Sequence, residues 1–173
     1  MSSLNYLAYG SNLFTPRLTA RITIRSVVAT VVLPGYGLRF NKRGADGSGK
    51  CQLQACVDEL AYGVVYRIDS ADKTTLDRIE GVGHGYELAL WHDQSLGECF
   101  FYSAQATAVD NSLLPFDWYH AYVLAGARQH GLPATYLAAI AAVATREDHN
   151  AQRRAENFSR LATAFPDIMP GQG

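Results

Sequence analysis

Residues 76–86 read Leu76-Asp77-Arg78-Ile79-Glu80-Gly81-Val82-Gly83-His84-Gly85-Tyr86, a helical pattern that gives way to a glycine-rich turn and a strand. Leu76 and Ile79 are three positions apart, as on one face of a helix. Gly81 suits the left-handed residue that commonly follows the last helical turn. The pattern therefore predicts a helix that ends at Glu80 and a turn that leads into a strand.

Glu80 lies where an acidic side chain is locally unfavourable. The C-terminal end of a helix carries partial negative charge, which disfavours an anion there by up to roughly 1 kcal/mol. Positions that violate local preferences are enriched in functional residues, and a carboxylate in such a place suits a proton-transferring base. The alternative is a solvated glutamate at a fraying helix end.

Length and composition predict one globular domain over residues 1–173, because no Pro/Ser/Gly-rich linker divides the sequence. The formal net charge is −1 and the basic residues are scattered, so we expect no nucleic-acid partner and no membrane partner. The most apolar runs, 27–33 and 138–144, are far shorter than the roughly 20 residues of a bilayer-spanning helix. Residues 1–5 show no signal-peptide pattern, so a cytoplasmic location is expected.

The cysteines and histidines form no recognisable metal pattern. Cys51, Cys56 and Cys99 are odd in number and lack a Cys-x-x-Cys pair, which argues against a disulfide framework and a zinc site. The five histidines lack the i, i+4 helical spacing of a metal site. We therefore predict no metal and expect the cysteines to be core thiols.

Two glycine-containing segments are candidate ligand loops. Residues 4–9 predict a strand that runs into the turn Tyr9-Gly10-Ser11-Asn12, whose small residues let backbone N–H groups face a ligand, although ordinary connections use the same residues. Residues 44–50 match the spacing of a phosphate-binding P-loop, but Cys51 stands where Ser or Thr would bind magnesium. The residues after it alternate like a strand, so a flexible loop between strands is expected there.

The remaining patterns predict strands first and helices last. The expected strands are residues 25–33, 36–40, 51–57, 61–68, 86–91 and 98–106, the first two paired as a hairpin around Pro34-Gly35. The expected helices are residues 71–80 with Ser70 as the N-cap, 115–131, 134–145 and 150–165. This order predicts an α+β fold with a largely antiparallel sheet, curled into a small barrel that hides its edges and flanked by helices.

Three blocks of the chain resemble the γ-glutamylcyclotransferases, a family of cytosolic enzymes with a small mixed β-barrel flanked by helices. Residues 7–13 resemble the family's Tyr-Gly-Ser-Asn substrate loop, and residues 62–86 resemble its strand-helix-turn block, in which a glutamate precedes a glycine. Residues 119–133 resemble the late helix whose leading tyrosine faces the site. The blocks occur in order, and the similarity extends from about residue 4 to about residue 145. Residues 46–50 also resemble a loop of bacterial members.

The resemblance implies a reaction that converts a small-molecule γ-glutamyl amide into 5-oxoproline and a free amine, without a cofactor. The substrate's own α-amine attacks its γ-carbonyl, and Glu80 would be the catalytic acid and base. The implied substrate-binding residues are Tyr9, Gly10, Ser11, Asn12, Leu13, Tyr86 and Tyr119. Without the resemblance, Tyr86 could equally be a plain strand residue and Tyr119 a core aromatic on an amphipathic helix.

Two other functions stay open at this point. The leaving amine could be a lysine-type isopeptide or another amine that is not an amino acid, because the residues do not identify the rim of the pocket. The chain could also be a non-catalytic module that binds a small ligand, although a decayed member would be expected to lose the Glu80 carboxylate first. The oligomeric state does not follow from the sequence, and a homodimer is one option.

Overall fold

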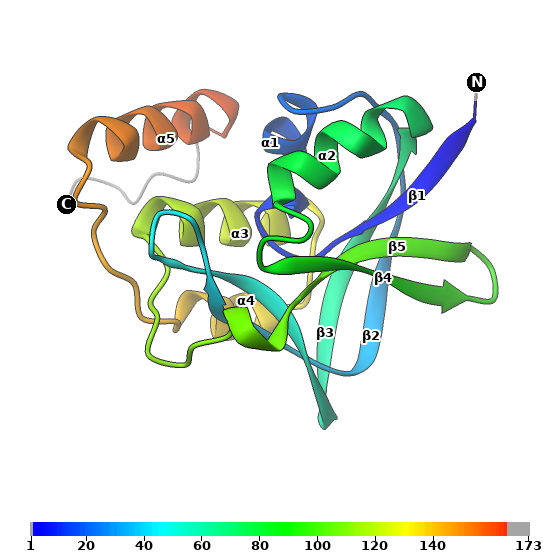
Figure 1. The fold of residues 1–173 in the computed structure, drawn as a ribbon, viewed down its shortest axis with the longest axis horizontal. Helices are drawn as coiled ribbons and strands as arrows, with labels where there is room; N and C mark the ends of the chain where they lie inside the picture. The colour runs from blue at the N-terminus through cyan, green and yellow to red at the C-terminus, as the bar shows by residue number, and fades with distance from the viewer. Residues whose placement is uncertain (1, 166–173) are drawn as a thin grey trace.

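The computed structural model describes residues 2–165 and places one sheet between helices (Figure 1). The strands are β1 (Ser3–Ala8), β2 (Ile24–Arg43), β3 (Gly49–Asp69), β4 (Tyr86–Asp93) and β5 (Gly97–Ala104). The helices are α1 (Thr15–Thr19), α2 (Lys73–Glu80), α3 (Asp117–Gln129), α4 (Ala134–Ala141) and α5 (Ala151–Ala164), with 3₁₀ turns at Ser11–Leu13, Ser70–Asp72 and Ala106–Ala108. The predicted α+β class is confirmed. The predicted domain, 1–173, includes residues outside the described range.

Strand β1 lies in the middle of the five-stranded sheet, whose order is β2-β3-β1-β5-β4. It runs antiparallel to β3, from Ser3 opposite Asp69 to Ala8 opposite Val64, and parallel to β5. Its last residues are buried because the strand has a neighbour on each side. The turn that follows β1 therefore emerges from the core rather than from an exposed edge.

The prediction of a closed barrel is wrong, because the sheet stays open. Strands β2 and β4 form its two edges, and no ladder joins them within residues 2–165. Closure needs strands of matched length and a regular stagger around the whole sheet. Here β1 has only six residues, and its register with β5 consists of the single pair Tyr6 and Phe100.

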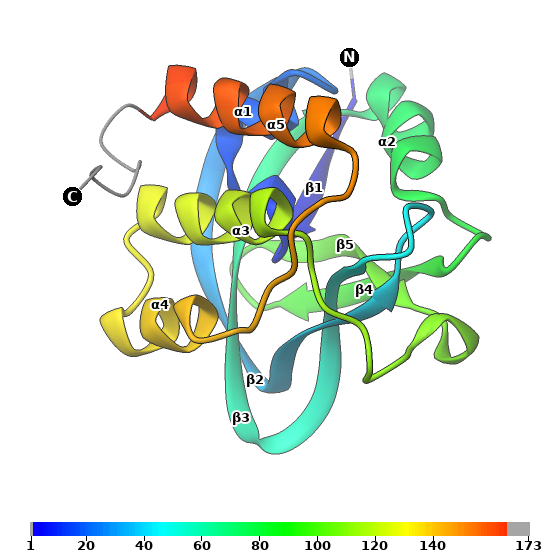
Figure 2. The ribbon, with the colours of Figure 1, turned by 90° about the vertical axis from the view of Figure 1, so that its left-hand side faces the viewer.

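Strands β2 and β3 form one long curled hairpin, which replaces the shorter strands expected from the sequence (Figure 2). The predicted turn at Pro34-Gly35 is a bulge inside β2, where the register shifts between Pro34 and Tyr36. An edge strand tolerates proline, and Gly35 takes the positive φ of 79° that the bulge requires. Residues 44–48 connect the two strands, as expected for a loop rather than a P-loop.

Helix α2 ends as its sequence predicts. Gly81 has a left-handed conformation, with φ of 76°, and its N–H bonds to the carbonyls of Arg78 and Asp77. Leu76 is fully buried and fixes the helix against the sheet. The predicted cap at Ser70 is wrong by one residue, because the Asp69 carboxylate accepts the N–H of Ala71 at the start of the preceding 3₁₀ turn.

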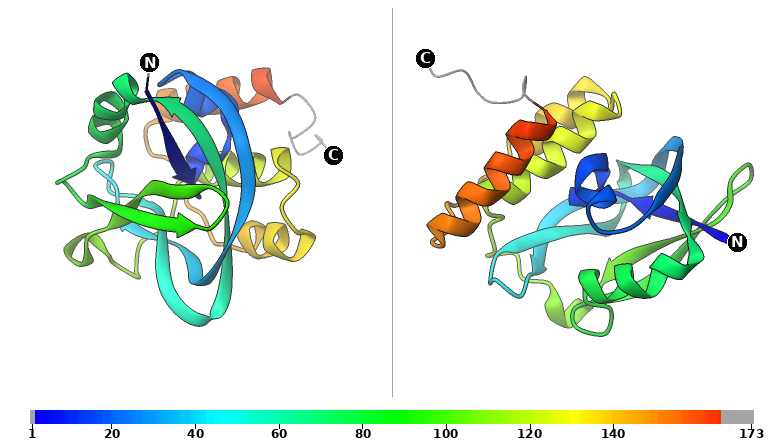
Figure 3. Two further views of the ribbon diagram at one scale, coloured as in Figure 1. Left: turned by 90° about the vertical axis from the view of Figure 1, so that its right-hand side faces the viewer. Right: turned by 90° about the horizontal axis from the view of Figure 1, so that it is seen from above.

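Helices α3 and α5 lie on one side of β1, and α2 lies on the other (Figure 3). Helix α3 packs against the 3₁₀ turn after β1 at Gly126, where an added Cβ would lie 2.4 Å from the backbone nitrogen of Phe14. Asn150 caps α5, as expected, by accepting the N–H of Arg153. Among residues 2–165, no helix has the length and apolar character needed to cross a membrane. The fold thus holds the β1 turn between α3 and α2.

Candidate active site

All the sequence-predicted site residues except Leu13 line one small polar cavity. It lies where the β1 turn, the end of α2 and the start of β4 meet the side of α3. Its lining residues are Tyr6, Tyr9, Gly10, Ser11, Asn12, Cys51, Glu80, Tyr86, Tyr102 and Tyr119. Leu13 is fully buried, packs against α3 at Gly126 and does not line this cavity, so its role in substrate binding stays a prediction.

The Glu80 carboxylate is held in place through one of its two oxygens. Oε1 accepts a hydrogen bond from Asn12 Nδ2 at 2.9 Å and one from Arg21 Nη1, also at 2.9 Å. The same Arg21 nitrogen lies 3.1 Å from Asn12 Oδ1, which closes a three-residue network. The side chains of Arg21 and Glu80 are about one fifth exposed, so this ion pair is only partly screened by water.

The second carboxylate oxygen of Glu80 has no hydrogen-bond partner within the described part of the chain. The Glu80 side chain lines both the small inner cavity and a larger outer cleft of about 450 Å³. A fixed carboxylate with one free oxygen can accept a proton from a ligand without first rearranging. This geometry is what a general base requires.

The turn after β1 offers unused backbone donors to the same cavity. Leu13 and Phe14 donate their N–H groups to the carbonyls of Gly10 and Ser11. The N–H groups of Ser11 and Asn12, at the start of the 3₁₀ turn, have no acceptor among residues 2–165. Unpaired N–H groups at such a terminus can bind a carboxylate or a polarised carbonyl oxygen.

The tyrosines of the cavity wall are bonded mostly to backbone groups. Tyr9 donates its hydroxyl to the carbonyl of Tyr102, and Tyr86 donates to the carbonyl of Cys51. The hydroxyl oxygen of Tyr119 accepts the N–H of Cys51 at 3.0 Å. Burial raises the pKa of the Tyr9, Tyr86 and Tyr119 phenols well above the ordinary value, so all three are neutral. They form a rigid wall in which none of the three is poised to ionise.

Cys51 is a wall residue of the cavity rather than a nucleophile. Burial raises the pKa of its thiol to about 12, which keeps it protonated at neutral pH. Its backbone holds Tyr86 and Tyr119 in place, as described above. The expectation of a core thiol agrees with its 1% exposure, although its position beside the site was not predicted.

The outer cleft is markedly basic. Besides Glu80, it has one other carboxylate, Asp46, which pairs with Lys50 Nζ at 2.8 Å. The basic side chains that line it are Arg17, Arg21, Lys42, Lys50 and Arg78. Its volume is in the range of small-molecule sites, whereas the inner cavity, about 30 Å³, holds little more than a water molecule. A ligand would therefore lie in the cleft and reach the free oxygen of Glu80 from there.

Sequence reasoning missed the residues that tune this site. Tyr6 accepts a hydrogen bond from Asn12, and its position in the middle of a strand gave no sign of this. Arg21 follows a five-residue helix in a segment without a clear pattern. Lys42 lies at the end of β2, just before residues 44–50, and has no motif of its own. Each is brought to Glu80 by tertiary structure rather than by a local motif.

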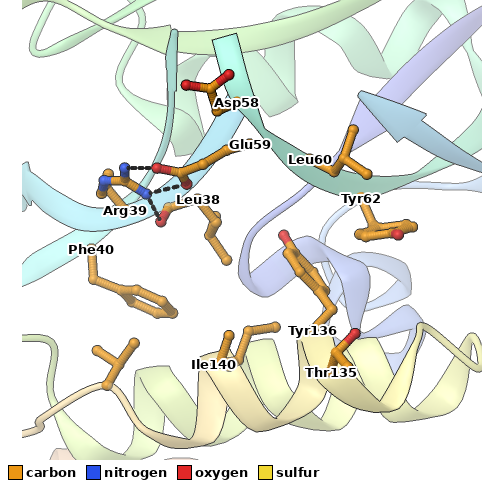
Figure 4. Close-up of a pocket in the computed structure, with 12 residues that line it drawn as sticks. Leu38, Arg39, Phe40, Asp58, Glu59, Leu60, Tyr62, Thr135, Tyr136 and Ile140 are labelled. Carbon is orange, nitrogen blue, oxygen red and sulfur yellow. Dashed lines mark hydrogen bonds and ion pairs between the residues drawn. The ribbon is translucent and has the colours of Figure 1, made fainter. Parts of the chain in front are cut away.

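A second cavity, about 580 Å³, lies between α4 and the β2–β3 hairpin (Figure 4). Arg39 and Glu59 neutralise each other, since Arg39 Nη1 lies 2.9 Å from Glu59 Oε2, and Asp58 is the one further charged residue of the lining. The rest of its wall is mainly apolar, including Leu38 and Ile140. The sequence-predicted residues all lie elsewhere, and no carboxylate here has the free, anchored geometry of Glu80. No group of three or more metal-ligating side chains occurs within residues 2–165.

The chain is similar to several known proteins. A family model described as the AIG2-like family matches residues 61–140, which include α2 and Glu80. A Mus musculus protein named gamma-glutamylcyclotransferase is 29% identical over 150 residues, covering 82% of this chain and 79% of the relative. A Homo sapiens protein of the same name is 28% identical over 149 residues, with the same coverage. A solved structure titled "Gamma-glutamyl cyclotransferase" superposes with a TM-score of 0.81 at 23% identity, covering 94% of this chain and 99% of that one.

The chain is thus similar to the AIG2-like family model over residues 61–140 and, over most of its length, to proteins named gamma-glutamylcyclotransferase. The resemblance inferred from three sequence blocks is thereby confirmed at the level of the superfamily. The solved structure adds agreement in fold, since its similarity extends over nearly the whole of both chains.

Proposed function

We propose that this protein is a cyclotransferase that converts γ-glutamyl amides, such as γ-glutamyl amino acids or peptides, into 5-oxoproline and a free amine. The observation that carries the proposal is the Glu80 carboxylate, anchored through one oxygen by Asn12 and Arg21 and free at the other. The named relatives support the class of reaction.

The reaction is an attack of the substrate on itself. The α-amine nitrogen forms a bond to the γ-carbonyl carbon, the bond from that carbon to the leaving nitrogen breaks, and protons pass from the attacking to the leaving nitrogen. At neutral pH the α-amine is mostly an ammonium and must lose a proton before it can attack. The free oxygen of Glu80 takes this proton and then delivers one to the departing amine.

The remaining groups of the site supply geometry. Holding the substrate folded, with its amine close to its carbonyl, accounts for a large part of the acceleration in reactions of this kind. In this proposal the N–H groups of Ser11 and Asn12, which have no acceptor among residues 2–165, bind the α-carboxylate or the oxygen on which charge develops. Since the attacking group belongs to the substrate, the protonated thiol of Cys51 is consistent with this chemistry.

The test is the release of 5-oxoproline, measured by chromatography, from a panel of γ-glutamyl amino acids, γ-glutamyl amines and glutathione. We expect product from at least one member of the panel, and at least about 100-fold slower release when Glu80 is replaced by Gln. Binding of the panel without any product would contradict the proposal and favour a non-catalytic module that binds a small ligand.

A further inference from the structure

Lys42 is an almost fully buried lysine without a carboxylate partner. It is 5% exposed and lines the outer cleft. Its ammonium lies 4.1 Å from the centre of the Tyr86 ring, and no ion pair involves it within residues 2–165. The other lysine of the cleft, Lys50, has its own acid in Asp46. Lys42 is therefore a buried charge that the protein itself leaves uncompensated.

Such a charge is unfavourable unless an anion joins it. Proteins pair almost every buried charge, because removal of an ion from water costs more than nearby neutral groups return. Burial lowers the pKa of Lys42, while the more distant charges of Glu80 and Asp46 raise it less. The absence of a side chain at Gly85 nonetheless leaves room for Lys42. A Cβ at Gly85 would lie only 3.0 Å from Lys42 Nζ.

Arg17 is a second cation of the cleft without an acid partner in the described residues. Its Nε donates to Ser11 Oγ at 3.2 Å, and its guanidinium lies over the Tyr122 ring, 4.4 Å from the centre. It is therefore beside the β1 turn, whereas Lys42 is beside Gly85 and at the base of the β2–β3 loop. Arg78 also lines the cleft without an acid partner in the described residues, but its side chain is exposed, so Arg17 and Lys42 are the unpaired cations that are shielded from water.

The charges of a γ-glutamyl amino acid match this arrangement. Such a compound has one ammonium and two carboxylates, one on the glutamyl part and one on the leaving amine. Glu80 suits the ammonium, and Arg17, next to the donors of the β1 turn, suits the glutamyl carboxylate. A γ-glutamyl amine lacks the second carboxylate and would leave Lys42 uncompensated.

We infer that Lys42 binds the carboxylate of the leaving amine and so makes this chain select γ-glutamyl amino acids over γ-glutamyl amines. The inference rests on the proposed function, because it assumes that the cleft holds a γ-glutamyl compound. It assigns to Lys42 a role in specificity, distinct from proton transfer at Glu80. An electrostatic contact of this kind discriminates by charge and is insensitive to the side chain of the leaving amino acid.

The test uses two ligands that differ only in this carboxylate, γ-glutamylalanine and γ-glutamylethylamine. Their binding is measured by titration calorimetry in the Glu80→Gln background, so that no turnover interferes. Lys42→Met is expected to weaken the binding of γ-glutamylalanine at least tenfold and the binding of γ-glutamylethylamine less than twofold. Lys42→Arg should keep most of the preference. Arg43→Met is the matched control, because Arg43 is the next residue and its exposed side chain pairs with Asp110.

Equal weakening of the two ligands by Lys42→Met, or an absence of γ-glutamylalanine binding before Lys42 is changed, would overturn the assignment. Lys42→Gln, which keeps a polar side chain, serves if the Met variant unfolds. The proposed function is judged separately, by 5-oxoproline release from the unmodified protein. If the protein binds γ-glutamylalanine through Lys42 but releases no 5-oxoproline, the role of Lys42 is supported and the proposed catalytic function is contradicted.

Discussion

Asn12 donates a hydrogen bond to Glu80 over 2.9 Å, although the two residues are 68 positions apart in the chain. The contact joins the turn after the central strand to the end of α2. It fixes the carboxylate of Glu80 toward the cavity, where a helix-terminal glutamate would otherwise extend into water. The proposed chemistry depends on this contact, since it orients the free carboxylate oxygen.

Replacement of Glu80 by Gln tests the proton transfer directly. The amide has the same size and can still accept the hydrogen bonds of Asn12 and Arg21, but it cannot take a proton. We expect 5-oxoproline release to fall by roughly 100-fold to 10,000-fold, the usual contribution of general acid–base catalysis. The thermal midpoint should change little. Glu156→Gln, in the exposed face of α5, is the control, and near-normal turnover in Glu80→Gln would assign the transfer to another group.

A proline at Ser11 tests the backbone donors of the β1 turn. Ser11 is the first residue of its 3₁₀ turn, a place where proline fits; besides the hydroxyl that accepts from Arg17, the change removes an N–H that has no acceptor among residues 2–165. Loss of one charge-assisted hydrogen bond, about 1.5 kcal/mol, predicts about tenfold weaker binding of a γ-glutamyl amino acid. Ser11→Ala keeps the N–H and removes the bond from Arg17, and is the control. If Ser11→Pro binds with unchanged affinity, the N–H is not a ligand donor.

Gly126→Ala tests the contact between α3 and the turn. Alanine usually stabilises a helix by about 1 kcal/mol relative to glycine. At Gly126, however, the new Cβ would meet the backbone of Phe14 at 2.4 Å, and overpacking against backbone typically costs 1–3 kcal/mol. We therefore expect a net loss of about 1 kcal/mol in the free energy of unfolding, with reduced activity. Urea unfolding measures this free energy, and Arg128→Ala, on the exposed face of α3, is the control. A Gly126→Ala variant that is more stable than the unmodified protein would contradict the close packing of α3 against the turn.

Asp148 predicts a stability that depends on pH. Its side chain is buried, and bonds from Arg153, the N–H of Asn150 and the indole of Trp118 hold its pKa well below the ordinary value. A carboxyl with a lowered pKa in the folded state contributes stability that is fully present above its unfolded pKa of about 4 and is lost as the pH falls toward the folded value.

Asp148→Asn should therefore lower the free energy of unfolding by about 2 kcal/mol at pH 7, with a smaller difference at pH 2.5. Urea midpoints at several pH values measure this. Glu147→Gln, whose side chain is 75% exposed, should show no such trend. A difference that is the same at both pH values would mean that the charge of Asp148 is not what stabilises the start of α5.

Local patterns in the sequence were sufficient for α2, its end at Gly81 and the β4–β5 hairpin, because these depend on neighbours in the chain. They were insufficient at Pro34-Gly35. These residues are typical of a turn, but here they form a bulge inside the edge strand β2. Barrel closure could not be judged either, since it depends on how distant strands match in length. In the site, Glu80 and the turn after β1 belong to recognisable motifs. Arg21 and Lys42 do not, because only the folded structure brings them near Glu80.

The central place of β1 in the sheet has a consequence for synthesis on the ribosome. The strand is made before the other four, and its antiparallel partner β3 and its parallel partner β5 emerge much later. Until Phe100 has left the exit tunnel, the N-terminal segment has at most one neighbour, and the cavity lacks Tyr119 until α3 follows. Contacts of such long sequence separation slow folding, so a nascent chain exposes an apolar strand for most of its elongation.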